Sequence, residues 1–504
     1  MRTSAVLGVV LAAAPACVHH IERTVSPEIA TVDRKAAFLK IHMKNGDLYV
    51  LSEWRADEQR RRITGRGDQL GADRLVVRRG ELEVEMADVA LYETNAIVTS
   101  PSIAAMAVIT GASVALSVMC IASPKSCFGS CPTFYAPSDA GPVLQAEGFS
   151  DAISPALETH DIDALWRTHV RDGHLTLRMT NEAYETHVVK RADVLAVPRP
   201  PGTRVLSTGE ELWLASRLVA PERCAAAEGD CTAALAAVDG RERTSLADDH
   251  DLAARETIDL EFPADARDGG GRTGVAIAAR QSLVTTFLLY QGLADLGTTA
   301  VEWLAELERA GPAAWLGGRK LQHLLGGIEV QIPDAAGWRT VAEVYETGPI
   351  ATDVHLVVLP DGLRVQRVRL RLPKGGWRID HVARVALEHT VTPIRIAPRA
   401  IRGTLGAEFA AGRAVATALP IVTQPGDAYE LDYAIPVGEV ELFLDSRGYY
   451  LEWMRAQWLR EERPLAAATL LLDPAQALRD LAPAWKRLEP SAEHQFWSSR
   501  YAHP

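Results

Sequence analysis

Four of the six cysteines lie at spacings that predict covalent chemistry. Cys224 and Cys231 flank a loop of small and polar residues, and so short a separation is typical of a turn closed by a disulfide. Cys127 and Cys131 enclose three residues and predict a second disulfide. A zinc site is the alternative, but no histidine pair lies near these cysteines at ligand spacing. Because disulfides persist in oxidising compartments, both pairs predict an exported protein.

Cys17 predicts a different modification, the attachment of lipid. Residues 1–17 are organised like an export signal: Arg2 is positive, and about ten small or apolar residues follow, too few to span a bilayer. The small residues before Cys17 resemble the lipobox of bacterial lipoproteins, in which the cysteine is acylated. Several acyl chains would anchor the protein firmly to a membrane. Cleavage of an ordinary secretory signal nearby is the alternative.

The densest acidic cluster of the chain contains Asp248, Asp249 and Asp251. These residues are the candidates for a metal site, because carboxylate oxygens are the ligands that calcium prefers. Their spacing does not match an EF-hand loop, which needs alternating ligands, a glycine and a terminal glutamate. The sequence therefore favours a solvated loop here and predicts no cofactor.

Three groups of histidine and aspartate could act as acid and base or hold a metal. They are His160 with Asp161 and Asp163, Asp353 with His355, and Asp380 with His381. Neighbours along a strand point to opposite faces, which separates Asp380 from His381, whereas Asp353 and His355 would share a face. A surface or core histidine is the favoured interpretation of each group. Motifs for a serine nucleophile, a zinc protease, a P-loop or a dinucleotide site are absent from the sequence, which favours binding over catalysis.

The composition is that of a folded globular protein rather than a disordered one. The chain has 504 residues, of which 47% are hydrophobic and 23% charged. At roughly 150 residues per domain, this length corresponds to about three domains. The formal net charge of −12 argues against a broad nucleic-acid surface, so no nucleic-acid partner is expected.

Residues 37–95 predict a small antiparallel β domain with the character of a barrel. Two alternating runs, 38–44 and 48–54, flank Asn45-Gly46, and this dipeptide between such runs is the strongest short signal for a β-hairpin. Further alternating runs follow at 74–78 and 81–91.

Residues 96–123 contain no charged side chain and predict an apolar helix. Its length could span a bilayer, but its many small and hydroxyl residues make insertion of 103–122 marginal. A helix buried in the protein or lying on a membrane surface is favoured, and a single inner-membrane span is the alternative.

The rest of the chain predicts β modules followed by helices. A β module at 125–198 ends at a proline-rich boundary, and a second at 203–325 includes a helix at 283–310. A module at 326–445 has several short strands with turn residues between them, as in a β-sandwich or jelly roll. Its run 364–372 alternates, with a slip of one residue near Val365. One face has Val365, Arg367, Arg369 and Arg371, and on or near the other lie Leu363, Gln366, Val368, Leu370 and Leu372.

Residues 446–504 predict helices, one at 448–463 that Pro464 stops and another that begins at Asp473-Pro474. In the first helix, four aromatic residues would form a stripe that could stack on sugar, although packing against a sheet is favoured. They are Tyr449, Tyr450, Trp453 and Trp458. The expected fold class is therefore mixed and mainly β, with a small barrel-like N-terminal domain, sandwich or jelly-roll modules, an inserted helix and a helical C-terminal end.

Three segments carry a likeness to a family. Residues 127–135 (CFGSCPTFY), 179–182 (MTNE) and 442–455 (LFLDSRGYYLEWMR) resemble an uncharacterised family of bacterial lipoprotein-like proteins. The resemblance covers most of the chain after residue 37 and implies an exported lipoprotein, but no activity and no catalytic residue.

These observations predict a lipid-anchored protein of the cell envelope. The residue after the cysteine is Val18 rather than an aspartate. In this respect the chain resembles lipoproteins of the Gram-negative outer membrane, which implies a position facing the periplasm or the cell surface. The expected role is a binding or structural module whose partner is an envelope protein or a glycan. A periplasmic hydrolase, with a site assembled from residues distant in sequence, is the alternative.

Overall fold

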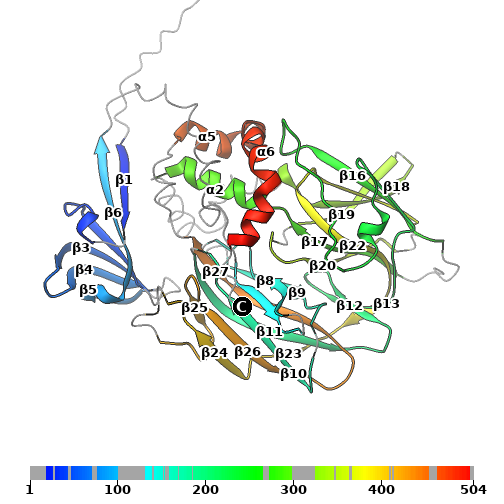
Figure 1. Cartoon of the computed structure of the whole chain (residues 1–504), viewed down its shortest axis with the longest axis horizontal. Helices are drawn as coiled ribbons and strands as arrows, with labels where there is room; N and C mark the ends of the chain where they lie inside the picture. Colours follow the sequence, from blue (N-terminus) through cyan, green and yellow to red (C-terminus); the bar gives the residue numbers. More distant parts are fainter. Residues whose placement is uncertain are drawn as a thin grey trace, which may run out of the picture.

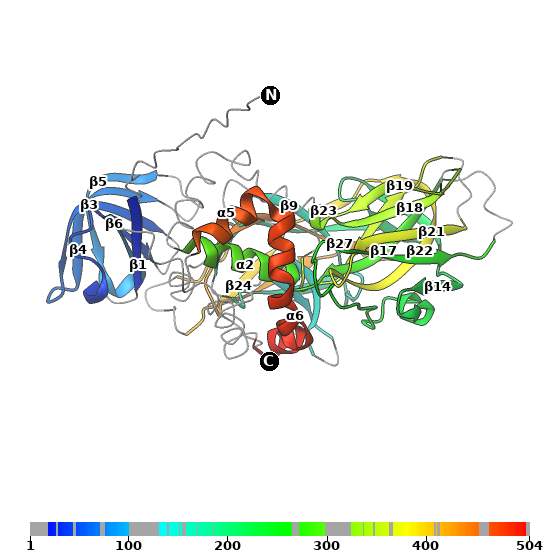
Figure 2. The ribbon, with the colours of Figure 1, turned by 90° about the horizontal axis from the view of Figure 1, so that it is seen from above.

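The structure, a computed structural model, is mainly β, as the sequence predicts. The residues that it describes are 19–26, 29–43, 47–70, 76–99, 131–138, 141–150, 152–153, 158–168, 170–183, 185–264, 272–297, 324–335, 337–345, 348–361, 366–407, 410, 414–452 and 463–499. In Figure 2 an N-terminal sheet lies at one end, a barrel with a companion sheet lies at the other, and helices lie over the middle.

The N-terminal sheet has six antiparallel strands in the order β1-β6-β2-β3-β4-β5 (Figure 1). They are β1 (His19–Ser26), β2 (Phe38–Met43), β3 (Leu48–Asp57), β4 (Arg62–Leu70), β5 (Val76–Glu85) and β6 (Val89–Thr99). The hairpin expected around Asn45-Gly46 is confirmed, because β2 pairs with β3. The sheet is open rather than barrel-like: β5 is an edge strand that buries only Leu82 and Val84, so it lacks the apolar face that closure would need.

The expectation of an apolar helix at 96–123 is wrong for the part of that segment that the structure describes. Residues 96–99 continue β6 and pair with β1, because β1 offers the backbone partners that a strand requires. Residues 100–123, with the possible span, lie outside the described residues. Among the described residues, no helix combines the length and the hydropathy needed to cross a bilayer.

Two sheets pack face to face as a sandwich in the middle of the molecule. One has the order β24-β26-β10-β7-β8; the other has the order β23-β11-β27-β9, with β25 paired to β11. The strands are β7 (Thr133–Ala136), β8 (Val143–Glu147), β9 (Thr159–Ala164), β10 (His174–Thr180), β11 (Glu185–Pro198), β23 (Ile394–Ile396), β24 (Ala400–Thr404), β25 (Ile421–Thr423), β26 (Ala428–Ala434) and β27 (Val440–Glu452). Leu177 and Leu431 of one sheet share a core with Val194 and Leu444 of the other.

The sandwich corrects the expected division into modules. Strands from the expected module 125–198 pair with strands from 394–452, so 125–198 and 326–445 do not form separate modules. The physical reason is that β11 is buried along most of its length, and its backbone groups are satisfied by the long β27.

The remaining strands form a closed barrel and a six-stranded antiparallel sheet that share a core. The barrel follows β12-β13-β22-β17-β20, and the sheet follows β15-β14-β16-β21-β18-β19. The strands are β12 (Arg204–Ser207), β13 (Leu212–Val219), β14 (Arg223–Ala226), β15 (Gly229–Asp230), β16 (Arg255–Glu261), β17 (Arg272–Gln281), β18 (Ile328–Asp334), β19 (Gly337–Val344), β20 (Asp353–Val358), β21 (Arg367–Pro373) and β22 (Trp377–Val391). On β21, Val368, Leu370 and Leu372 are all fully buried, which confirms the expected face.

Among the described residues, the α-helices α2 (Val284–Leu296), α5 (Pro464–Leu472) and α6 (Pro474–Ser499) lie over the sandwich beside the barrel (Figure 1). The start of the helix expected at 283–310 is confirmed by α2, and residues 298–323 lie outside the described part of the chain. The helix expected after Asp473 is confirmed by α6, where the Asp473 carboxylate accepts a hydrogen bond from the Gln476 N–H at 3.2 Å.

The helix expected at 448–463 is wrong for its first residues. Residues 448–452 belong to β27 and pair with β11, because the ladder with β11 satisfies their backbone groups and places Tyr449 in the sandwich core. Pro464 begins α5 instead of stopping a helix. Since Tyr449 and Tyr450 are neighbours on a strand, they form no helical stripe, and Trp453 and Trp458 lie outside the described residues.

Candidate functional site

The first predicted disulfide is confirmed: Cys224 and Cys231 are bonded, with their Cα atoms 5.0 Å apart. Both cysteines are buried in the core below β14 and β16, and the Cys231 N–H donates to the Cys224 carbonyl at 3.1 Å. Cys17 and Cys127 lie outside the described residues, and Cys131 is buried. Lipidation and the second disulfide therefore stay predictions.

The aspartates considered for a metal serve as turn and ion-pair residues. Asp248 accepts the N–H of His250 at 3.0 Å, and this backbone hydrogen bond is the main reason that its pKa lies below the usual range. Asp249 is exposed and lies 3.5 Å from the Lys486 ammonium. Asp251 accepts the N–H of Ala253 at 2.9 Å. The described residues contain no group of three side chains able to hold a metal.

Strand alternation predicts the placement of one of the three histidine–aspartate groups. His355 lies 3.4 Å from the Asp353 carboxylate on the same face of β20. The separation expected for Asp380 and His381 is wrong, because a bulge in the pairing of β22 with β17 interrupts the alternation at Asp380. Both side chains contact the segment 235–240: Asp380 accepts the Gly240 N–H at 2.9 Å, and the His381 Nδ1 lies 2.9 Å from the Leu235 carbonyl. His160, however, meets Asp445 of β27 at 2.7 Å rather than an aspartate of its own strand, because β9 pairs with β27.

The structure brings together a pocket of about 280 Å³ that no sequence motif marks. It lies where the sandwich strands β8 and β9, the barrel strands β17 and β20, and the end of α6 meet. Polar or aromatic residues of its lining are Gln145, Trp166, Arg167, Glu242, Arg280, Thr352 and Trp497, and apolar ones are Leu144, Ala164, Val238, Ile350 and Val354.

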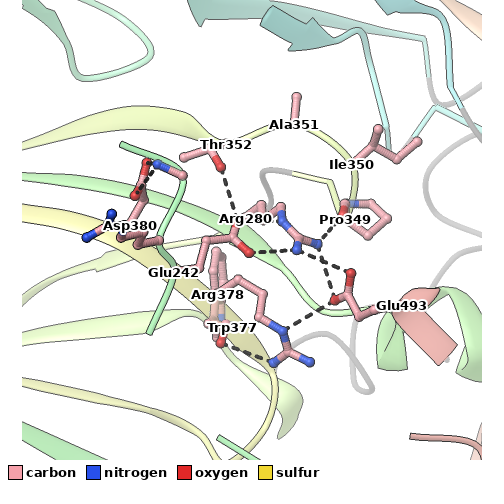
Figure 3. Close-up of polar contacts among 12 residues, drawn as sticks. Glu242, Arg280, Pro349, Ile350, Ala351, Thr352, Trp377, Arg378, Asp380 and Glu493 are labelled. Carbon is pink, nitrogen blue, oxygen red and sulfur yellow. Dashed lines mark hydrogen bonds and ion pairs between the residues drawn. The ribbon is translucent and has the colours of Figure 1, made fainter. Parts of the chain in front are cut away.

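Arg280 forms the charged centre of the pocket wall (Figure 3). Its Nε and Nη2 each donate to Glu242 at 2.7 Å, and its Nη1 donates to the Pro349 carbonyl at 2.8 Å. Nη1 and Nη2 also donate to Glu493 of α6 at 3.3 and 3.2 Å, so all the N–H groups of the guanidinium are engaged. Burial lowers the pKa of Arg280, but the two glutamates outweigh burial and raise it overall.

Glu493 joins the pocket wall to a second buried arginine, Arg378 of β22. The Arg378 Nε lies 3.3 Å from Glu493, and burial lowers the pKa of this guanidinium (Figure 3). The indole N–H of Trp497 also donates to Glu493, at 3.2 Å. The α6 carboxylate is therefore shared by two barrel arginines and a pocket tryptophan.

A second ion pair holds the opposite part of the wall. The fully buried Asp380 accepts the N–H of Gly240 at 2.9 Å and pairs with Arg167 at 3.0 Å. Burial raises the pKa of Asp380, and the charge of Arg167 opposes that rise. Gly240 has a φ of +82°, in the left-handed region that favours glycine, so the turn that brings Glu242 to Arg280 depends on this residue type.

Buried carboxylates lie behind the wall on β8 and β9. The Glu147 carboxylate accepts the N–H of Ile350 at 2.7 Å, which fixes the loop before β20. Asp163 is buried, and its Oδ2 has no hydrogen-bond partner among the described residues. Burial, with smaller contributions from Asp161, Asp353 and Glu147, raises the pKa of Asp163 well above the usual range. The proton on Asp163 therefore persists above the pH at which an ordinary aspartate ionises.

No family model, no curated protein and no solved structure matches the chain. The assignment of the site therefore depends on geometry alone, and the lipoprotein-like resemblance stays a prediction.

Sequence reasoning missed the residues that carry the pocket. Arg280 and Arg378 each end or begin an apolar strand, and Glu493 lies near the end of a helix more than a hundred residues away. One feature of the sequence could have indicated this site: an arginine within an otherwise apolar strand. Such a cation is buried when the strand is buried, and it then needs an anionic partner.

Proposed function

We propose that this is an exported, lipid-anchored protein of the cell envelope that binds a small polar molecule. The observation that carries the proposal is the pocket between sandwich, barrel and α6, built around Arg280 and its two glutamates. The Cys224–Cys231 disulfide supports export, because structural disulfides belong to oxidising compartments. The lipobox-like residues before Cys17 support anchoring.

Binding is favoured over hydrolysis by the state of the pocket carboxylates. Glu242 and Glu493 are both committed to Arg280, whereas a general acid needs a carboxyl that holds a proton. Asp163 has the raised pKa of such a group, but it lies behind Ala164 rather than in the lining. Among the described residues of the lining there is no serine or cysteine, and the one hydroxyl, that of Thr352, donates to Glu242.

The test is a thermal-shift screen of the purified protein against monosaccharides, amino acids, organic acids and nucleosides. A molecule that binds the folded chain at about 100 times its Kd stabilises it by about 2.7 kcal/mol, which raises Tm measurably. At the same ligand concentration the shift should fall to about half in Trp497→Ala, at the pocket, and persist in full in Trp338→Ala on β19, outside the lining. Equal shifts in both variants would place binding elsewhere, and the absence of any shift would contradict the proposal.

A further inference from the structure

We infer that the ligand of this pocket is a neutral, hydroxyl-rich molecule of the size of one sugar ring. The inference rests on the proposed function and narrows it from small polar molecules in general to one chemical class. It depends on three features of the pocket: its internal ion pairs, its mixture of hydrogen-bond donors and acceptors, and its two indole rings.

Each of the three arginines at the wall is paired with a carboxylate. The cations are Arg167, Arg280 and Arg378, and the anions are Glu242, Asp380 and Glu493, joined in contacts of 2.7 to 3.3 Å. Arg280 has no N–H left for a ligand. A ligand that pairs a charge with Arg280 would have to displace one of these bonded partners, which leaves a charge buried without compensation. The centre of the pocket therefore disfavours a charged group in its occupant.

The polar groups that face the pocket suit hydroxyl groups. Glu242 is partly accessible, and its Oε2 accepts a single hydrogen bond from the residues described, so it can accept a second. The Arg167 side chain lines the pocket, is 38% exposed and uses Nη2 for Asp380, so its Nε and Nη1 can still donate. Thr352 adds a hydroxyl that already donates to Glu242 at 3.3 Å. A sugar hydroxyl donates and accepts at once, so it can bridge a carboxylate and a guanidinium.

Two indoles supply the apolar surface that the C–H face of a sugar ring requires. The Arg204 guanidinium lies 4.0 Å from the Trp166 ring and fixes its position. Trp497 is held by its hydrogen bond to Glu493 and by the edge of Phe496, with ring centroids 5.3 Å apart. Rings held in place lose little entropy when a ligand packs on them.

The size of the pocket limits the ligand further. Its volume of about 280 Å³ lies just below the roughly 300–1,000 Å³ typical of sites for drug-sized molecules. A single ring fits this space better than an oligosaccharide does. The expected ligand is therefore a neutral monosaccharide or one terminal sugar of a glycan.

The experiment is isothermal titration of the full chain with glucose, galactose and N-acetylglucosamine, and with their charged counterparts glucuronate and glucosamine. We expect at least one neutral sugar to bind, and its charged counterparts to bind about tenfold more weakly or not at all. Affinity should change little between low and high salt, because neutral ligands are not screened. Trp497→Ala should lower the affinity by about tenfold, Trp497→Phe should retain most of it, and Trp338→Ala should match the unchanged protein.

Two results would overturn the inference, and they differ in what they say about the pocket. If amino acids or organic acids bind with strong salt dependence and neutral sugars do not, the ligand class is wrong, but the pocket remains a binding site. If no class of molecule binds, the proposed function fails together with the inference. Sugar binding that is equally strong in Trp497→Ala and Trp338→Ala would assign the sugar to another surface.

Discussion

Single buried charges determine the shape of the pocket wall. Arg280 is almost fully buried, and its position is fixed by Glu242 from the loop before β16 and by Glu493 from α6. Each partner is itself largely removed from water, so the network is stable only while all three side chains are present. The stability of the pocket wall therefore depends on the complete set of ion pairs rather than on any one hydrogen bond.

Arg280→Met tests that dependence, because it removes the cation and leaves two carboxylates in the wall. We expect the free energy of unfolding to fall by about 3–5 kcal/mol, the usual cost of breaking a buried pair. Arg272→Met is the matched control: it lies on the same strand, and its ion pair with Asp361 is exposed. Urea denaturation of both variants measures the difference. Similar losses in the two would show that the network adds no stability of its own.

Asp163 predicts a pH dependence of stability with a definite sign. Its pKa is higher in the folded chain than the ordinary aspartate value that applies after unfolding, mainly because of burial. The folded state therefore binds the proton more tightly, and stability falls as the pH rises from about 4 toward the folded pKa. Asp163→Asn should remove this decline and raise stability at neutral pH.

The measurement for Asp163→Asn is the free energy of unfolding across a pH series. Asp161, Asp353 and Glu147 face the same group and should be left intact. Asp249→Asn, an exposed change, serves as the control and should follow the unchanged protein. A variant that loses stability at neutral pH with the decline still present would show that ionisation of Asp163 is not the cause.

Turns and strands fix these residues at the scale of elements. The disulfide between Cys224 and Cys231 closes the turn between β14 and β15, which leads to the loop that carries Glu242. Gly240 and Asp380 then set the course of that loop against β22. The site is thus built from short elements held by covalent and ionic contacts to the barrel.

Replacement of Cys224 and Cys231 together by serine should lower the free energy of unfolding by about 2 kcal/mol, because the short loop gains freedom in the unfolded chain. The variant should still fold, since both positions lie in a large apolar core. Denaturant unfolding measures the loss, and peptide mapping without reduction of the unchanged protein checks the bond. Two free thiols in protein isolated from the envelope would count against both the bond and export.

At the scale of the whole molecule, the sandwich lies between the N-terminal sheet and the barrel and contacts both (Figure 2). Segments 133–198 and 394–452 share both of its sheets, and the barrel is inserted between them in sequence. Gln424 of the sandwich donates to the Met43 carbonyl at 3.2 Å and so contacts the N-terminal sheet.

Cys17→Ser tests where the protein is held. If the cysteine is acylated, the variant should leave the membrane fraction or accumulate as an uncleaved precursor, because each buried CH₂ contributes about 0.8 kcal/mol to anchoring. Fractionation with labelled fatty acid measures this, and the unchanged protein, which should take up the label and stay in the membrane fraction, is the comparison. Retention of Cys17→Ser after alkaline washing would favour a span at 103–122 instead.

The sequence by itself determined the features that depend on near neighbours. Alternation predicted the two faces of β21 and the hairpin of β2 and β3, because side chains alternate along a regular strand. It failed for Asp380 and His381, where a bulge in β22 interrupts the alternation. Short spacing predicted the disulfide of Cys224 and Cys231.

Tertiary structure alone decided the pocket and the pairing of distant strands. Arg280 and Glu493, like Arg167 and Asp380, are separated by 213 residues, and nothing local in the chain specifies that they meet. Residues 448–452 became a strand because β11 supplied the backbone partners, which outweighed a local pattern typical of a helix. Both outcomes have one physical reason: a buried charge or backbone group must find a partner, and the fold, not the sequence interval, determines which partner is within reach.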